Sequence, residues 1–102
     1  MKLVVVPMIV LAATLSGNPA LAGDPITGKA KFAVCAGCHG PDGMGNAALG
    51  YPQLAGKDAA YVATQLRDFK SGKRDSATMK AMAAGLNDGY IENVASYIAT
   101  LK

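Results

Sequence analysis

Apolar residues recur at helical spacing in three parts of the chain, and no segment shows the alternation of a half-buried strand. We predict helices from residue 24 into 35–39, from 58 to about 69, and from 87 onwards. Each begins at a side chain that can accept a hydrogen bond from a first-turn N–H: Asp24, Asp58 or Asn87. The pattern therefore predicts an all-α fold.

Two of these helices are expected to cross. The last helix carries an apolar stripe at i, i+3, i+7 and i+10, formed by Ile91, Val94, Ile98 and Leu101. In the first helix Gly28 and Phe32 share one side, where glycine allows another helix backbone to approach closely. We predict that the last helix packs there. A partly apolar face is also expected from Ile26, Ala30, Ala33 and Val34, and the middle helix has its own face of Val62, Leu66 and Phe69.

Glycine and proline mark the segments between the helices. Residues 40–46 and 50–56 are rich in turn formers and are predicted to be loops. The middle helix is expected to end at Gly72, inside the basic segment 70–74. The alanine-rich segment after it, which contains Met79 and Met82, is expected to be a connecting loop.

Residues 1–22 have the features of a secretory signal peptide. Lys2 precedes an apolar run at 3–15 that is too short to span a bilayer as a helix, and Ala20-Leu21-Ala22 forms a cleavage site. Cleavage before Gly23 leaves residues 23–102 as one domain of 80 residues. The alternative is an uncleaved membrane anchor, but a basic stop-transfer flank is missing. We expect a periplasmic protein without stable membrane insertion.

Charge and size narrow the function further. The expected mature chain has nine Lys and Arg against seven Asp and Glu, a net charge of +2. This weak bias does not indicate nucleic-acid binding. A core of this size is marginal by itself, and small proteins often gain stability from a metal or a covalent cofactor.

The chain contains one strong chemical motif, Cys35-Ala36-Gly37-Cys38-His39, which has the C-x-x-C-H spacing that attaches a c-type haem. Each thiol can add to one vinyl group of the haem, and the histidine is then held under the iron. A redox-active dithiol usually follows a buried strand, and none is predicted before Cys35. A structural zinc site needs about four ligands, whereas the chain has two cysteines and one histidine. Haem attachment is the preferred interpretation, and an unattached dithiol or disulfide is the alternative.

The second axial ligand of such a haem is found by elimination. His39 is the only histidine in the sequence, and methionine is the other common ligand. Two of the five methionines lie in the predicted signal peptide, and Met44 follows His39 too closely. Met79 and Met82 remain, although either could instead fill space in the core. We prefer Met79.

Together these residues resemble a class I cytochrome c of the small bacterial monohaem type, and one half of the dihaem periplasmic cytochromes that contain two such units. The resemblance covers residues 28–101 and rests on the segments 35–40, 42–45, 51–56, 65–74, 79–86 and 95–98. It implies the small cytochrome c fold, an all-α arrangement of three to five helices around one covalently attached haem.

The resemblance also implies roles for six residues: Cys35, Cys38, His39, Pro52, Leu54 and Met79. The cysteines would form thioethers, and the histidine and methionine would bind the iron. The Pro52 carbonyl would accept the Nδ1 proton of the histidine, and Leu54 would pack on the haem. In this family the axial methionine commonly lies seven residues before the apolar residue that precedes the last helix cap. Counting back from Leu86 gives Met79, with Met82 as runner-up.

We therefore expect a one-electron carrier rather than an enzyme, acting as a monomer with transient redox-protein donors and acceptors. One alternative is a haem protein with a labile methionine that binds small ligands or reacts with peroxide. Another is the haem subunit of a larger oxidoreductase. A shuttle should lose partner affinity as salt screens its cations, which include Lys57, Lys70, Lys73, Arg74 and Lys80.

Overall fold

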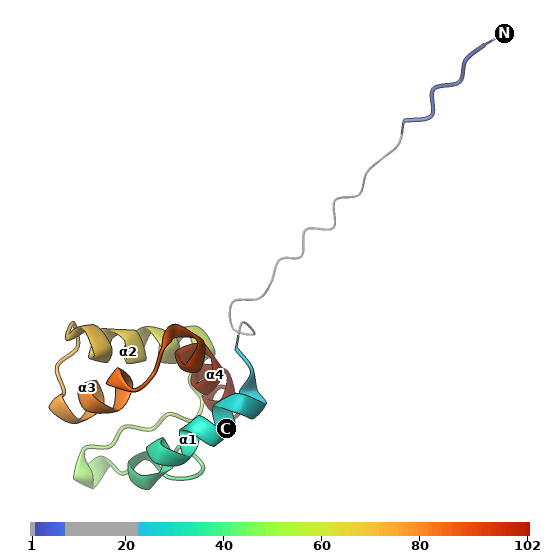
Figure 1. Cartoon of the computed structure of the whole chain (residues 1–102). Helices are drawn as coiled ribbons and strands as arrows, with labels where there is room; N and C mark the ends of the chain where they lie inside the picture. The colour runs from blue at the N-terminus through green and yellow to red at the C-terminus, as the bar shows by residue number, and fades with distance from the viewer. Residues whose placement is uncertain (1, 8–22) are drawn as a thin grey trace.

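The computed structural model describes residues 2–7 and 23–102 (Figure 1). It contains α1 (Pro25–His39), the short 3-10 helix η2 (Ala47–Leu49), α2 (Ala59–Ser71), α3 (Ala77–Ala84) and α4 (Asp88–Ile98). Within these residues the only β pairing is an isolated bridge between Asn46 and Tyr51. The all-α prediction is confirmed. Residues 1 and 8–22, which include most of the predicted signal peptide, lie outside the described residues, so cleavage before Gly23 stays a prediction.

The three predicted helix starts are confirmed because each cap makes its local hydrogen bond. The side chains of Asp24, Asp58 and Asn87 accept from the backbone N–H groups of Ile26, Tyr61 and Tyr90 at 3.0, 2.7 and 2.8 Å. α2 also ends as predicted, because Gly72 adopts the left-handed conformation with φ 84°. These bonds satisfy groups that a helix leaves free at its ends.

The predicted crossing of α1 and α4 is present, and α4 runs behind α1 in Figure 1. A Cβ atom on Gly28 would lie 1.9 Å from the carbonyl oxygen of Asn93, so the two backbones are in direct contact. One turn later the ring centroids of Phe32 and Tyr97 are 5.2 Å apart. Glycine therefore sets the closest point of the crossing, and an aromatic pair packs beside it.

The wider apolar face predicted for α1 is wrong. Ile26 is 84% exposed, Val34 is 65% exposed, and Ala30 and Ala33 are exposed as well. The reason is that α1 contacts α4 along a narrow strip at i and i+4 positions. Its other sides face solvent or, at Val34, a cavity.

α2 and α4 supply most of the core. The predicted inward faces of both helices are buried, and Ile91 and Val94 are fully enclosed. α4 ends at Ile98, so Leu101 lies beyond the helix, half-buried against the same core. The buried cluster consists of Phe32, Ala59, Val62, Ala63, Leu66, Ile91, Val94, Ala95 and Ile98.

The expectation of a connecting loop around Met79 and Met82 is wrong, because this segment forms α3. The Ser76 Oγ accepts a hydrogen bond from the backbone N–H of Met79 at 3.1 Å and caps the helix. Alanine and methionine have high helix propensity, and fully buried Ala83 holds the short helix in place. No helix in the described part of the chain is long and apolar enough to cross a membrane.

Candidate functional site

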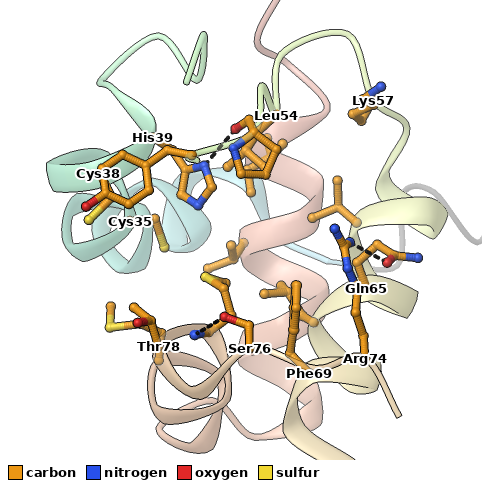
Figure 2. A pocket seen from close by; sticks show the side chains of 18 of the residues that line it. Cys35, Cys38, His39, Leu54, Lys57, Gln65, Phe69, Arg74, Ser76 and Thr78 are labelled. Atoms are coloured by element: carbon orange, nitrogen blue, oxygen red, sulfur yellow. Dashed lines mark hydrogen bonds between the residues drawn. The ribbon is translucent and has the colours of Figure 1, made fainter. Parts of the chain in front are cut away.

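A cavity of about 670 Å³ lies between α1, the 50–54 loop, α2 and α3 (Figure 2). Its volume is in the range of about 300–1,000 Å³ found for ligand and cofactor sites. Much of its wall is apolar, from Val34, Leu54, Val62, Leu66, Phe69, Val94 and Ile98. Cys35, Cys38, His39, Pro52 and Met79 also line it. The structure thus brings all six predicted site residues to one cavity.

His39 is the last residue of α1 and is only 6% exposed. Its Nδ1 lies 2.8 Å from the carbonyl oxygen of Pro52. A carbonyl can only accept, so Nδ1 is the donor in this hydrogen bond, and in the neutral imidazole Nε2 is then the nitrogen with the lone pair. Figure 2 shows the ring with its other nitrogen directed into the cavity. The side chain is therefore oriented as a metal-binding imidazole requires, with Nδ1 held by a carbonyl.

The loop that carries Pro52 is held close to the end of α1. The backbone N–H of Gly45 donates to the His39 carbonyl at 2.7 Å, and Gly45 has φ 71°. A Cβ at this position would lie 2.5 Å from the Tyr51 carbonyl oxygen. Glycine is required here both for the backbone conformation and for the close approach that brings the Pro52 carbonyl to the histidine.

Both cysteines lie at the cavity wall and are not joined in a disulfide, with Cys35 half-buried and Cys38 exposed. Burial, together with the nearby Cys38, raises the pKa of the Cys35 thiol. The Tyr51 hydroxyl lies beside Cys38, and this contact raises the pKa of the tyrosine. A catalytic dithiol needs a thiolate with a lowered pKa. The environment of Cys35 therefore argues against the dithiol alternative.

The structure also argues against zinc. In the described ranges 2–7 and 23–102, no group of three or more His, Cys, Asp or Glu side chains is placed to hold a metal ion. The two thiols lie one helical turn apart on α1, where each can reach a different substituent of a large planar ligand. This arrangement suits two covalent bonds to one edge of a haem.

Two methionines reach the cavity from α3. Met79 is half-buried and packs against the core cluster, whereas Met82, one turn later, is 40% exposed. Met44 is 50% exposed and does not line the cavity. The sulfur that is best enclosed among these belongs to Met79.

Sequence reasoning missed several polar residues of the cavity wall. Arg74, treated above as a surface cation, lines the cavity together with Gln65, Ser76 and Thr78. Gly72 could have indicated this position for Arg74, since a left-handed residue at the end of α2 turns the following segment back along that helix.

The cavity as a whole fits haem c, because it combines an apolar wall, two cysteines at one side and an imidazole nitrogen directed inward.

This fold and site define a small haem-binding c-type cytochrome. The family model described as Cytochrome c matches residues 26–102, and the chain belongs to this family. It carries one haem c, covalently attached through Cys35 and Cys38.

Individual relatives include a protein of similar length and a longer one. The chain is 47% identical over 72 residues to the thiosulfate dehydrogenase electron acceptor of Thiomonas intermedia, covering 71% of this chain and 33% of that protein. It is 38% identical over 82 residues to cytochrome c-554(548) of Halomonas halodenitrificans, covering 78% of this chain and 98% of that protein.

Among solved structures, reduced cytochrome c4 from Pseudomonas stutzeri superposes with a TM-score of 0.72 at 38% identity. The match covers 78% of this chain and 50% of that structure. The chain thus spans about half the length of cytochrome c4 and less than half of some longer relatives. It is similar to one half of cytochrome c4.

Proposed function

We propose that this protein is a periplasmic one-electron carrier whose haem iron is bound by His39 and Met79. The observation that carries the proposal is that both side chains line one cavity from different helices, α1 and α3. The imidazole already has its Nδ1 engaged by Pro52, which leaves Nε2 for iron. Two protein ligands would occupy both axial positions, so the haem would exchange electrons without binding a substrate at the iron.

Met79 is favoured over Met82 by its surroundings. Its backbone is fixed by the Ser76 cap at the first turn of α3, and its side chain packs on the core. Met82 lies nearer the solvent. An axial ligand that stays bound needs a side chain with few competing conformations, and burial supplies this constraint.

The surroundings also suit an electron carrier. A thioether ligand and a largely apolar wall, which includes Leu54, favour Fe(II) over the more charged Fe(III) and raise the reduction potential. Relatives named as cytochromes and as an electron acceptor support this proposal.

We propose that the donors and acceptors are redox proteins that bind transiently to a monomer.

Optical spectra of the haem-loaded protein test the ligation. We expect low-spin spectra, a weak far-red sulfur-to-iron band when oxidised, and no response of the reduced protein to CO. Met79→Ala should abolish the far-red band and admit CO, whereas the control Met82→Ala should keep the wild-type spectra. A high-spin wild type, or prompt CO binding, would instead support the ligand-binding alternative.

Two further measurements test the cellular role. Expression of the full chain with a haem-maturation system should give periplasmic protein that begins at Gly23, as read by mass spectrometry. An intact N-terminus in the membrane fraction would contradict this. Copurification with a dehydrogenase at high salt would favour a permanent subunit over a shuttle, whose binding should weaken with salt.

A further inference from the structure

Met82 differs from the other methionines of the domain in its place at the edge of the cavity. It lines the cavity and is also 40% exposed. Met79 lines the cavity too but is half-buried against the core cluster, and Met44 is 50% exposed but does not line the cavity. In the described ranges 2–7 and 23–102, Met82 is therefore the exposed thioether that also reaches the haem site.

Helix α3 carries Met79 and Met82 on one side. Residues three apart in a helix lie one turn apart on the same face. The Ser76 cap fixes this helix at its first turn, and fully buried Ala83 fixes it near its end. In the described part of the chain, Met79 is among the residues packed against the core cluster and Met82 is not. A chemical change at Met82 therefore alters the cavity rim without entering the core.

An accessible thioether is oxidised by peroxides. The Sδ atom attacks one oxygen of hydrogen peroxide, the O–O bond breaks, and the products are methionine sulfoxide and water. The sulfur loses two electrons and the peroxide gains them. A sulfur bound to iron has donated a lone pair to the metal, which slows the same reaction at an axial ligand. Methionine sulfoxide reductases return the product to the thioether.

We propose that Met82 is a site of reversible oxidation by peroxides that lowers the reduction potential of the haem. The proposal rests on the electron-carrier function and on the Met79 ligation proposed above. Oxidation converts a flexible apolar side chain into a polar one. At the rim of a largely apolar cavity, this polar group and the water that it attracts favour the more charged Fe(III). The carrier would then hold its electron less tightly under oxidative stress.

Mild treatment with hydrogen peroxide tests the site of oxidation. Ferric, haem-loaded protein is exposed to a limited amount of peroxide, the remainder is removed with catalase, and the modified residues are read by peptide mass spectrometry. We expect sulfoxide at Met82 and at Met44, and none at Met79. Sulfoxide at Met79 in protein whose Met82 stays unmodified would overturn the proposal.

Met44→Leu and Met82→Leu then separate the two exposed sulfurs, since leucine keeps a similar apolar volume. In Met44→Leu, peroxide should lower the ratio of reduced to oxidised haem at fixed ambient potential by roughly twofold, because the potential depends on the polarity around the haem. This ratio corresponds to a fall of about 18 mV, at 59 mV for each tenfold change. In Met82→Leu the ratio should not change.

Reversal provides the second arm of this test. Methionine sulfoxide reductases with dithiothreitol as reductant should restore the untreated potential of Met44→Leu. Equal responses of Met44→Leu and Met82→Leu to peroxide would overturn the proposal. So would loss of the helical circular dichroism signal in treated Met44→Leu, because the shift would then reflect unfolding.

Spectra recorded before peroxide is added keep this result separate from the proposed ligation. Untreated Met79→Ala and Met82→Ala identify the axial ligand, so an error in the ligation is seen there. If Met79 is the ligand and peroxide leaves Met82 unmodified, the oxidation site alone is wrong. If treated Met44→Leu binds CO, the oxidation has displaced the ligand, and the proposed effect through the cavity rim is refuted.

Discussion

Replacing Gly28 with alanine tests the packing that holds α1 against α4. The added Cβ would lie 1.9 Å from the Asn93 carbonyl oxygen and 2.5 Å from its carbonyl carbon. Real Cβ contacts are essentially never shorter than 3.0 Å. Both neighbours are backbone atoms, which cannot swing aside as a side chain would. The distance from the Cβ to the Asn93 oxygen must therefore grow from 1.9 Å to at least 3.0 Å, so the helices must separate locally by about 1.1 Å or more.

The cost can be worked out from this displacement. Overpacking of this kind costs about 1–3 kcal/mol. Separation also weakens the aromatic contact between Phe32 and Tyr97, which contributes about 0.5–1.5 kcal/mol beyond burial. The higher helix propensity of alanine returns about 1 kcal/mol. The net loss in the free energy of unfolding is about 2 kcal/mol, which corresponds to a fall in Tm on the order of 10 °C for a domain of this size.

The assay is thermal unfolding of the haem-loaded proteins at pH 7, followed by far-ultraviolet circular dichroism and by Soret absorbance. Gly37→Ala is the control, because Gly37 lies in the same helix and a Cβ there meets no atom within 4 Å. Its Tm should be unchanged or slightly higher. A Gly28→Ala protein as stable as Gly37→Ala would refute the close-approach argument.

Two other predictions concern charged side chains. Asp24→Ala should lower the Tm at pH 7, because the Asp24 carboxylate accepts hydrogen bonds from the Ile26 N–H and the Thr27 hydroxyl, and the latter bond is the main cause of its lowered pKa. A carboxyl with a lowered pKa stabilises the fold at pH values above its unfolded-state pKa, so the Tm difference between wild type and Asp24→Ala should shrink as the pH falls below about 4. Asp24→Asn keeps a capping oxygen and should show a smaller fall in Tm. A Tm difference that does not change with pH would contradict this role of the carboxylate. Glu92→Gln removes the 2.6 Å ion pair that links α4 to Arg67 on α2. Because the Arg67 and Glu92 side chains are 41% and 29% exposed, urea denaturation should show a loss below about 1 kcal/mol that diminishes in 1 M salt; a larger, salt-independent loss would indicate a different role for Glu92.

The sequence by itself determined the parts of this protein that depend on near neighbours. The starts of α1, α2 and α4 follow from Asp24, Asp58 and Asn87, since a cap acts over two or three residues. The haem attachment site follows from the spacing of three residues in one helix turn. The crossing of α1 and α4 was also predictable, because an i, i+4 pair of glycine and phenylalanine opposite an apolar stripe favours one mode of packing.

The tertiary structure decided the rest. Met79 was chosen from the sequence, but its place in the first turn of α3 depends on the Ser76 cap and on burial of Ala83 between helices. The exposure of Ile26 depends on how narrow the contact with α4 is. Arg74 became part of the cavity wall because the turn after α2 folds back onto Gln65. Such contacts join residues that come together only when whole helices pack against one another. Hydrophobic periodicity and capping residues describe each helix separately, so they do not predict which residues of different helices will be close.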